Sequence, residues 1–491
     1  MNPILDFVRA TVDRFPEQVA IADRDQAISY SALWHTASCL GSVIPDTGSA
    51  VGVFVNRGAD TLALFLAAIF SGNFYVPLDP ELPAEKLHSI LADAEIQTIL
   101  GDDCNRPLLV DFSGRFLTLA DCGQEECAVP EVQTDTPLYM VYTSGSTGKP
   151  KGVLKSHGAV LSFLNAYIER FGFSSEDVIG NQTPFFFDAS AKDYFLSMKV
   201  GARLEILPSE LFSFPVRLIE YMNERKITFI SWVPTALCIV TQLNTFMEIL
   251  PNTLRRVFFV GEVFPRKQLD KWRKTLPQLE YVNLFGSSEL AGICCCYPVE
   301  GELPEGAALP LGKPLGNCQV VLMDQGQVVT EPDHVGEIYV ASPALALCYY
   351  HDDEKTAASF FDMTFPDGIT RRTFRTGDMA SYDANGDLVF AARRDYQIKH
   401  MGRRIELGEI EAIADRVKEL NRCCCLYNAE KKHITLFCEL ADGCDWNGRQ
   451  VRSALKGHLT DYMMPSKVIV MGKLPLNANG KIDRQKLKTL L

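Results

Sequence analysis

Short runs of apolar, β-branched and aromatic residues recur through the first four-fifths of the chain. Examples are the runs 51–55, 138–142, 227–231, 256–260 and 281–285. Runs of this length and composition predict strands, and helical spacing at 215–226 and 266–275 predicts helices between them. This alternation is typical of an α/β protein with parallel-type sheets, in which ligands bind in the loops that follow the strands.

The pattern changes near residue 395, where the charged segment 393–404 leads into a helix with carboxylates at 406–411. Beyond it, the pattern predicts strands at 423–427 and 433–440, a helix at 449–462, a further strand and a basic terminal helix. A chain of 491 residues is more than three times the roughly 150 residues of a typical domain. We therefore expect a large multi-layer N-terminal domain over 1–394 and a small α+β domain over 395–491.

Composition and charge narrow the classes of function. The chain is 47% hydrophobic and 22% charged, and 48 Lys and Arg against 61 Asp and Glu give a net charge of −13. Such a surface disfavours nucleic acid and anionic membranes as partners. The longest apolar run, 62–70, is too short to span a bilayer, and the N-terminus does not have the pattern of a leader. We expect a soluble, cytoplasmic protein without membrane insertion.

The 15 cysteines include the runs 294–296 and 423–425, without CxxC pairs or the Cys/His spacing of a zinc site. This arrangement predicts reduced, mostly buried cysteines that pack as small apolar residues.

The segment 142–152 carries the clearest chemistry. It follows a predicted strand and places three glycines, four small hydroxyl residues and two lysines within eleven residues. Glycines let backbone N–H groups approach phosphate oxygens, hydroxyls donate further hydrogen bonds and lysine supplies charge. Because Pro150 follows Lys149, this is not a Walker A loop. We interpret it as a phosphate-binding loop, and His157 beyond it as a packing residue instead of a general base.

Ten motifs, in order, resemble those of the adenylate-forming superfamily, which includes acyl-CoA and aryl-CoA synthetases, luciferases and nonribosomal peptide adenylation domains. They are 75–79, 142–152, 187–190, 283–289, 336–338, 374–378, 393–399, 402–411, 462–465 and 474–483. The likeness extends over nearly the whole chain. It is greatest to amino-acid-activating members, including stand-alone D-alanine:carrier protein ligases.

The resemblance implies a role for each matching position. Glu289 would bind Mg²⁺, Asp378 would accept hydrogen bonds from the ribose, and Lys481 would bridge the substrate carboxylate and the α-phosphate. The catalytic set is Lys481, Glu289, Thr143 and Lys151. The ATP-binding set is Thr143, Ser144, Gly145, Ser146, Thr147, Gly148, Lys149, Phe285, Gly286, Ser287, Ser288, Asp378, Arg393 and Lys481. Asp395 would be the hinge about which the C-terminal lid turns between two half-reactions.

The implied reaction uses ATP and Mg²⁺ to activate an amino acid as its adenylate with release of pyrophosphate. The aminoacyl group then passes to the phosphopantetheine thiol of a carrier protein. We expect that carrier in trans, because the sequence continues only briefly after Lys481 without a carrier-like segment. Two alternatives stay open: an acyl- or aryl-CoA synthetase, and a catalytically silent nucleotide-binding protein.

The substrate class is predicted from Asp188. In amino-acid-activating members an aspartate at this position pairs with the substrate α-ammonium, and a buried carboxylate is costly unless it is paired. The remaining predicted substrate residues are Ala189, Lys192, Ser231, Phe258, Val260, Gly261, Leu284, Gly292 and Ile293. Lys192 among apolar neighbours favours an acidic substrate, such as glutamate or aspartate. If Lys192 instead turns to Asp193 or solvent, D-alanine or another small neutral amino acid is the alternative.

Overall fold

The computed structural model describes residues 1–45, 47–56, 58–143, 150–302, 308–393, 397–476 and 482–491. The chain divides into two compact units. The first consists of Met1–Pro80, Asp93–Val141 and Gly152–Arg394, and the second of Glu81–Ala92, Tyr142–Lys151 and Asp395–Leu491. The main division falls where the sequence pattern changes, but two short N-terminal segments group with the C-terminal residues.

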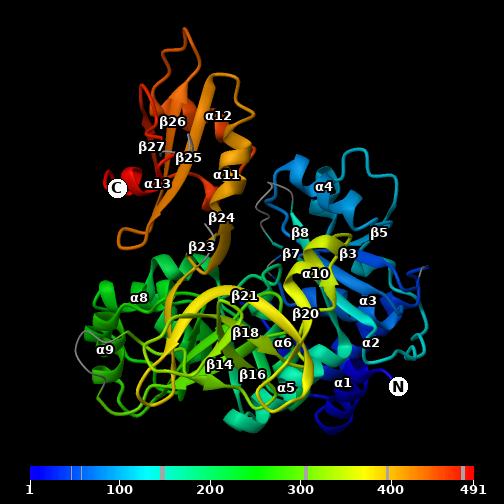
Figure 1. Cartoon of the computed structure of the whole chain (residues 1–491). Coiled ribbons are helices and arrows are strands. Elements are labelled where there is room, and N and C mark those ends of the chain that lie inside the picture. The colour runs from blue at the N-terminus through cyan, green and yellow to red at the C-terminus, as the bar shows by residue number, and fades with distance from the viewer. Residues whose placement is uncertain (46, 57, 144–149, 303–307, 394–396, 477–481) are drawn as a thin grey trace. The chain divides into compact units, whose positions relative to one another are not determined.

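The first unit of the chain, which is drawn whole in Figure 1, contains a nine-stranded sheet. Its order is β15 (Lys313–Pro314), β14 (Ile293–Pro298), β13 (Glu280–Gly286), β12 (Arg256–Val260), β11 (Phe229–Trp232), β9 (Val178–Asn181), β10 (Arg203–Ile206), β1 (Val19–Ala22) and β2 (Ala27–Ser29). The strands from β13 to β1 pair in parallel, and the outer pairs are antiparallel. The carboxyl ends of β11, β12 and β13 therefore lie together at one edge.

A second sheet has seven strands in the order β19 (Cys348–Tyr349), β8 (Lys151–Ser156), β7 (Pro137–Thr143), β4 (Phe74–Leu78), β3 (Ala50–Phe54), β5 (Thr98–Leu100) and β6 (Arg115–Leu117). The pairs from β7 to β6 are parallel, as the apolar runs predict. The helices before the C-terminal residues are α1 (Pro3–Arg14), α2 (Tyr30–Gly41), α3 (Thr61–Phe70), α4 (Ala84–Asp93), α5 (His157–Phe171), α6 (Ala191–Val200), α7 (Pro215–Glu224), α8 (Pro234–Gln242), α9 (Arg266–Thr275) and α10 (Asp353–Ser359).

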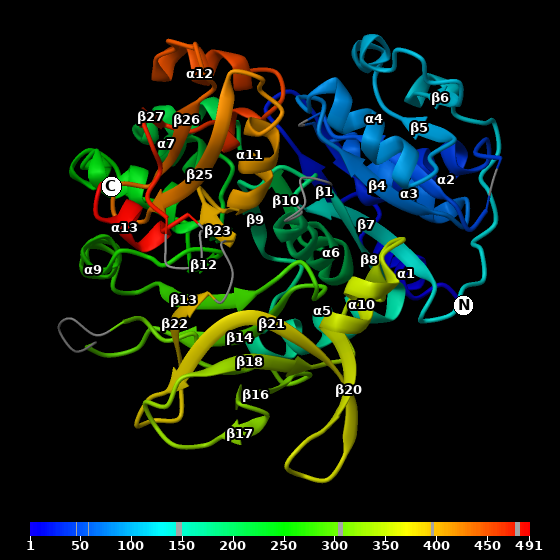
Figure 2. The same cartoon turned by 45° about the horizontal axis from the view of Figure 1, so that its top comes forward.

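The third sheet is antiparallel and was not anticipated from the sequence (Figure 2). It consists of β17 (Gln327–Val329), β16 (Gln319–Asp324), β18 (Gly336–Ala341), β21 (Thr370–Tyr382) and β20 (Phe360–Thr364), with β22 (Leu388–Arg393) also paired to β21. A tight turn joins β16 to β17, and Gly326 in that turn has a φ of 81°. Half-buried strands of this kind carry mixed polar and apolar residues, so no continuous apolar run marks them.

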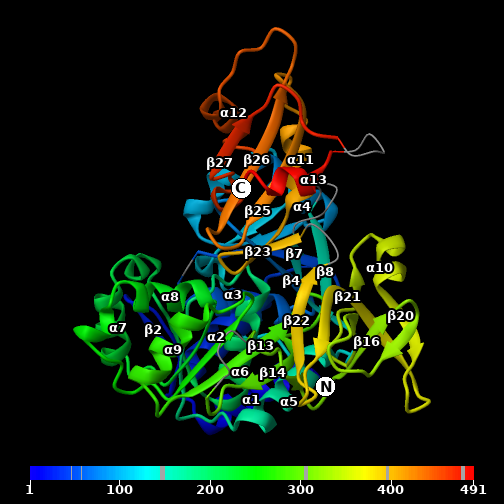
Figure 3. The same cartoon turned by 60° about the vertical axis from the view of Figure 1, so that its left-hand side comes forward.

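The C-terminal residues form the predicted small α+β fold within the second unit. Strands β23 (Gln397–His400) and β24 (Arg403–Glu406) form a hairpin, and β25 (Leu420–Asn428), β26 (His433–Leu440) and β27 (Lys467–Val470) form a sheet. Helices α11 (Leu407–Ala414), α12 (Gly448–Leu455) and α13 (Arg484–Lys488) accompany that sheet (Figure 3). Helix α12 ends well before residue 462, the predicted end, because Gly457 has a φ of 91° and turns the chain.

Within the described part of the chain, no helix is both long and apolar enough to cross a membrane.

Candidate functional site

Side chains on the central strands of the nine-stranded sheet divide between two buried clusters. Phe258 and Leu284 belong to the cluster that includes the apolar residues of α5 and α6, whereas Phe259 and Tyr281 belong to the other. Because successive side chains of a strand point to opposite faces, Ser231 shares the face of Phe258, its partner across β11 and β12. Three predicted substrate residues therefore lie on the face covered by α5 and α6.

The other predicted substrate residues come from segments around the same strands and helices. Asp188 and Ala189 lie in a 3₁₀ turn that leads directly into α6, and Lys192 is in the first turn of α6. Val260 ends β12, and Gly261, which follows it, has a φ of 97°. Gly292 and Ile293 lie at the start of β14, and a Cβ added to Gly292 would come within 2.4 Å of a ring on α5, that of Phe163.

Asp188 is held by two groups of the protein itself. The Lys155 ammonium on β8 donates to Asp188 Oδ1, and the Tyr139 hydroxyl on β7 donates to the same oxygen at 3.0 Å. The Lys155 side chain is fully buried, and 14% of the Asp188 side chain is exposed. Burial of this carboxylate therefore does not by itself call for a substrate cation, because Lys155 already supplies a positive charge, and the contact of Asp188 with a substrate ammonium stays a prediction.

Burial shapes the electrostatics of this pair. Removal from water raises the pKa of Asp188 and lowers the pKa of Lys155, while their mutual attraction opposes both changes. The nearby Glu289 carboxylate raises both pKa values. Whether the proton lies on Lys155 or on Asp188, the two groups together carry no net charge.

Aromatic side chains surround the Lys155–Asp188 pair. Lys155 Nζ lies 3.2 Å from the Tyr139 hydroxyl and 5.1 Å from the centroid of the Tyr139 ring. The Tyr139 ring stacks on Tyr75 at a centroid distance of 5.4 Å, and the Tyr75 and Tyr194 hydroxyls are 2.8 Å apart. The ammonium therefore has a charged partner, a hydroxyl and a ring face, which is what a buried cation requires.

Lys192 forms a separate buried ion pair. Its ammonium donates to Asp193 Oδ1 and to the Ala189 carbonyl, both at 2.9 Å, and Asn181 Nδ2 donates to Asp193 Oδ2 at 3.2 Å. The Lys192 and Asp193 side chains are 4% and 2% exposed. The sequence allowed two interpretations of Lys192, and the observed contact agrees with the one in which Lys192 turns to Asp193. The inference of an acidic substrate loses its basis, because Lys192 does not require a substrate anion.

The predicted metal-binding residue Glu289 lies just after β13. Its side chain is fully buried, and Tyr349 on β19 donates to Glu289 Oε1 at 2.8 Å. Two residues earlier, the Ser287 hydroxyl is buried without a hydrogen-bond partner among the described residues. Adenylation domains use ATP with Mg²⁺, a hard cation that prefers oxygen ligands. A buried carboxylate and, two positions earlier in the sequence, an unpartnered hydroxyl are the kinds of group that fit a magnesium-bound phosphate.

The structure also brings together the two residues predicted to contact the nucleoside. Asp378 on β21 and Arg393 on β22 are directly paired across the antiparallel strands. Arg393 Nη1 donates to Asp378 Oδ1 at 2.8 Å, and Asp378 is 2% exposed. A carboxylate oriented in this way can accept hydrogen bonds from a diol.

The phosphate loop is described only at its ends. Thr143 ends β7 and Lys151 begins β8, and the buried Thr143 hydroxyl has no hydrogen-bond partner within the described ranges. The predicted ATP-binding residues Phe285 and Gly286 end β13, and Ser288 follows them. Eight predicted residues lie outside the described residues: Ser144, Gly145, Ser146, Thr147, Gly148, Lys149, Asp395 and Lys481.

His157 and the cysteines were not among the residues predicted for this site. His157 begins α5 at 1% exposure, and desolvation lowers its pKa to about 4, which agrees with a packing role. All 15 cysteines are free, and ten of them are buried, as the sequence predicts. Burial raises the pKa of Cys424 and of Cys438 to about 11, which makes both thiols poor nucleophiles at neutral pH.

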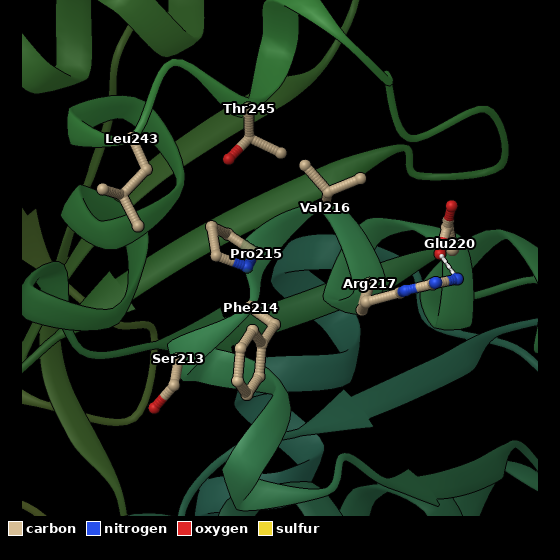
Figure 4. A pocket seen from close by; sticks show the side chains of 8 residues that line it. All are labelled: Ser213, Phe214, Pro215, Val216, Arg217, Glu220, Leu243 and Thr245. Carbon is tan, nitrogen blue, oxygen red and sulfur yellow. Dashed lines mark hydrogen bonds and ion pairs between the residues drawn. The ribbon is translucent and has the colours of Figure 1, made fainter.

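A surface pocket lies near the start of α7, away from these segments in sequence (Figure 4). Phe214, Pro215 and Leu243 contribute apolar surface, and Arg217 donates to Glu220 at 2.9 Å. None of the residues that line it belongs to the predicted site.

Sequence reasoning missed Lys155, Tyr139 and Tyr349. Lys155 had a detectable signal, since it is a second lysine, after Lys151, within the buried strand that follows the phosphate loop. Its pairing with Asp188 links residues 33 positions apart, and no local pattern predicts such a contact. Tyr139 and Tyr349 are aromatic residues in strands, a position that normally indicates packing alone.

Comparison with known proteins agrees with the resemblance that the sequence motifs indicate. A family model described as AMP-binding enzyme matches residues 8–350. Tyrocidine synthase 3 of Brevibacillus parabrevis is 30% identical over 486 residues, which cover 96% of this chain but only 7% of that protein. This chain therefore corresponds to a small part of that relative.

Solved structures share the fold over nearly the whole chain. The crystal structure of IdnL1 has a TM-score of 0.81 at 27% identity and covers 96% of this chain and 98% of that one. Holo-PA1221, an NRPS protein containing adenylation and PCP domains, has a TM-score of 0.86 at 23% identity, covering 99% of this chain and 84% of that one. These likenesses confirm the α/β fold class with a smaller C-terminal part.

Proposed function

The chain belongs to the AMP-binding enzyme family, and on that premise we propose that it is a ligase that activates a carboxylic acid as its adenylate. The observation that carries this proposal is the buried Glu289 carboxylate with the unpartnered Ser287 hydroxyl close by in sequence. These oxygens suit a magnesium-bound triphosphate. Asp378 and Arg393 would hold the nucleoside.

In the proposed reaction, a carboxylate oxygen of the acid forms a bond to the α-phosphorus of ATP as the bond to pyrophosphate breaks. Bound magnesium would neutralise charge on the triphosphate. The protein must supply donors and cations where charge develops. Glu289 and Ser287 would orient the phosphates, and Asp378 would fix the ribose through hydrogen bonds. The role of Lys481 at the reacting carboxylate stays a prediction, as do those of Thr143 and Lys151.

We propose the phosphopantetheine thiol of a carrier protein as the acceptor. The thiol would attack the acyl carbon, form a thioester and release AMP. Support comes from the similarity to an NRPS protein that contains both adenylation and PCP domains. A carrier acting in trans, a cytoplasmic location and a lid that turns at Asp395 stay predictions.

Free coenzyme A is a second candidate acceptor, and one observation favours it. The main argument against a CoA synthetase was that Asp188 would need a substrate ammonium, whereas in the structure Lys155 compensates Asp188. Amino-acid substrates, including D-alanine, now rest on the resemblance alone. An acidic amino acid has the least support, because Asp193 already meets the charge of Lys192.

ATP–pyrophosphate exchange on the purified protein tests the adenylation step, with a panel of aryl, hydroxy, fatty and amino acids. We expect exchange that depends on a particular acid, and its loss in Glu289→Gln and Lys481→Ala. Absence of exchange with every acid would refute the proposed function. Thioester formation with coenzyme A or with a phosphopantetheinylated carrier then distinguishes the two acceptors.

A further inference from the structure

Lys155 is a charged residue that the proposed chemistry does not use. It is fully buried in β8, and its contacts are with Asp188 and Tyr139, both described above. Burying a lysine is costly, so its partner must be a permanent part of the structure. Asp188 is that partner, and it is also the residue at which a substrate ammonium was expected.

We propose that Lys155 is a built-in counter-ion of Asp188 and determines specificity, so that the activated acid carries no ammonium group at this position. This inference rests on the proposed function and names the substrate class of the same site. The preferred substrates would be carboxylic acids whose neighbouring substituent is neutral, such as a hydroxyl, hydrogen or an aromatic ring.

The charges of the site support this reading. A substrate ammonium at Asp188 would place two cations on one carboxylate, and like charges repel strongly where water is excluded. Glu289 lies near the pair, but the proposed function commits its carboxylate to magnesium. A cationic substrate would therefore enter a site whose negative charge is already compensated.

A neutral polar substituent has a candidate partner. Ser231 is 2% exposed, and its side-chain hydroxyl has no hydrogen-bond partner within the described part of the chain. Ser231 lies on the sheet face that carries the other predicted substrate residues. A hydroxyl can both donate and accept, so it suits an uncharged group.

Matched substrates on the wild-type protein give the first test. Each amino acid is compared with the hydroxy acid and the unsubstituted acid that have the same side chain, and β-alanine with propionate. We expect kcat/KM for exchange to be at least about tenfold higher for the neutral member, which corresponds to one pKa unit of charge interaction. Equal or better exchange with the amino acids would overturn the inference while leaving adenylation intact. No exchange with either series would overturn the proposed function as well.

Substitution of Lys155 gives the second test. Lys155→Met should shift the ratio of the two kcat/KM values toward the amino acid by about tenfold, because Asp188 then needs a cation. The double variant Lys155→Met/Asp188→Asn should return the preference to neutral acids. Lys199→Met, at a half-buried lysine on α6, is the matched control and should leave activity and ratio unchanged. An unchanged ratio in folded Lys155→Met would overturn the role of Lys155.

If Lys155→Met fails to fold, the binding of adenylate analogues to the wild-type protein still tests whether the site excludes an ammonium group. Thermal shifts of the wild-type protein are measured with matched aminoacyl and acyl sulfamoyladenosines, which differ only in the amino group. We expect a larger shift with the acyl compound. A larger shift with the aminoacyl compound would contradict the inference without reference to turnover.

Discussion

Replacement of Lys192 by methionine tests the buried ion pair on α6. The change keeps the length of the side chain but removes the cation that pairs with Asp193, itself 2% exposed. Breaking a buried pair by removing one partner typically costs about 3–5 kcal/mol, because the other charge is left uncompensated. We expect a loss of this size in the free energy of unfolding of the first unit.

The loss should depend on pH in a definite direction. Burial raises the pKa of Asp193, and Lys192 opposes that rise. Without Lys192 the folded-state pKa of Asp193 moves further above its unfolded value, so folding then favours the protonated acid. The destabilisation should therefore be larger at pH 8 than at pH 5.

Urea unfolding followed by tryptophan fluorescence measures these changes. The double variant Lys192→Met/Asp193→Asn should recover most of the loss, because asparagine keeps an acceptor for the Asn181 amide. Lys267→Met, at an exposed lysine of α9, should change stability by less than about 0.5 kcal/mol. A loss below about 1 kcal/mol in Lys192→Met, or no recovery in the double variant, would show that Lys192 is not paired as described.

Three further outcomes follow from the site. Glu289→Gln should lower magnesium-dependent exchange by about 100-fold. Tyr349→Phe, which removes a hydrogen bond to the same carboxylate, should lower it by about tenfold. Equal losses in the two variants would contradict a direct role for Glu289. Because the pKa of His157 is held near 4, stability should fall by roughly 3 kcal/mol as the pH drops from 6.5 to 4, and His157→Leu should flatten that dependence in urea titrations. Brief alkylation followed by mass spectrometry should find Cys104, the exposed thiol, labelled first, and the singly labelled protein should keep its exchange activity. Loss of activity after one label per chain would contradict the prediction that the cysteines have no catalytic role.

Continuous apolar runs in the sequence predicted much of the core. The run 256–260 corresponds to β12, and the helical spacing at 266–275 corresponds to α9. Both are buried elements whose period follows directly from their backbone geometry. Strand β21 was missed because its thirteen residues alternate between buried and exposed positions and include several charges. Its identity depends on pairing with distant strands.

The sequence predicted which candidate site residues lie together where two of its motifs lie on strands that are neighbours in the sheet. Asp378 and Arg393 come together because β21 pairs directly with β22. The partners of Asp188 and Lys192 were not settled by sequence, since each residue type suits several roles. Only the fold shows that Lys155 reaches Asp188 and that Lys192 turns to its neighbour Asp193. Long-range charge pairing, more than secondary structure, limited the prediction of the substrate.

Transfer of ¹⁸O from the carboxylate of the acid tests the central claim most directly. The acid that supports the fastest pyrophosphate exchange is labelled in its carboxylate and incubated with ATP, Mg²⁺ and a thiol acceptor. Activation as an adenylate predicts one labelled oxygen in the AMP that is released, because the acyl–oxygen bond breaks when the thiol attacks. Label in inorganic phosphate, with ADP as the nucleotide product, would contradict the assignment of the chain as an adenylate-forming ligase.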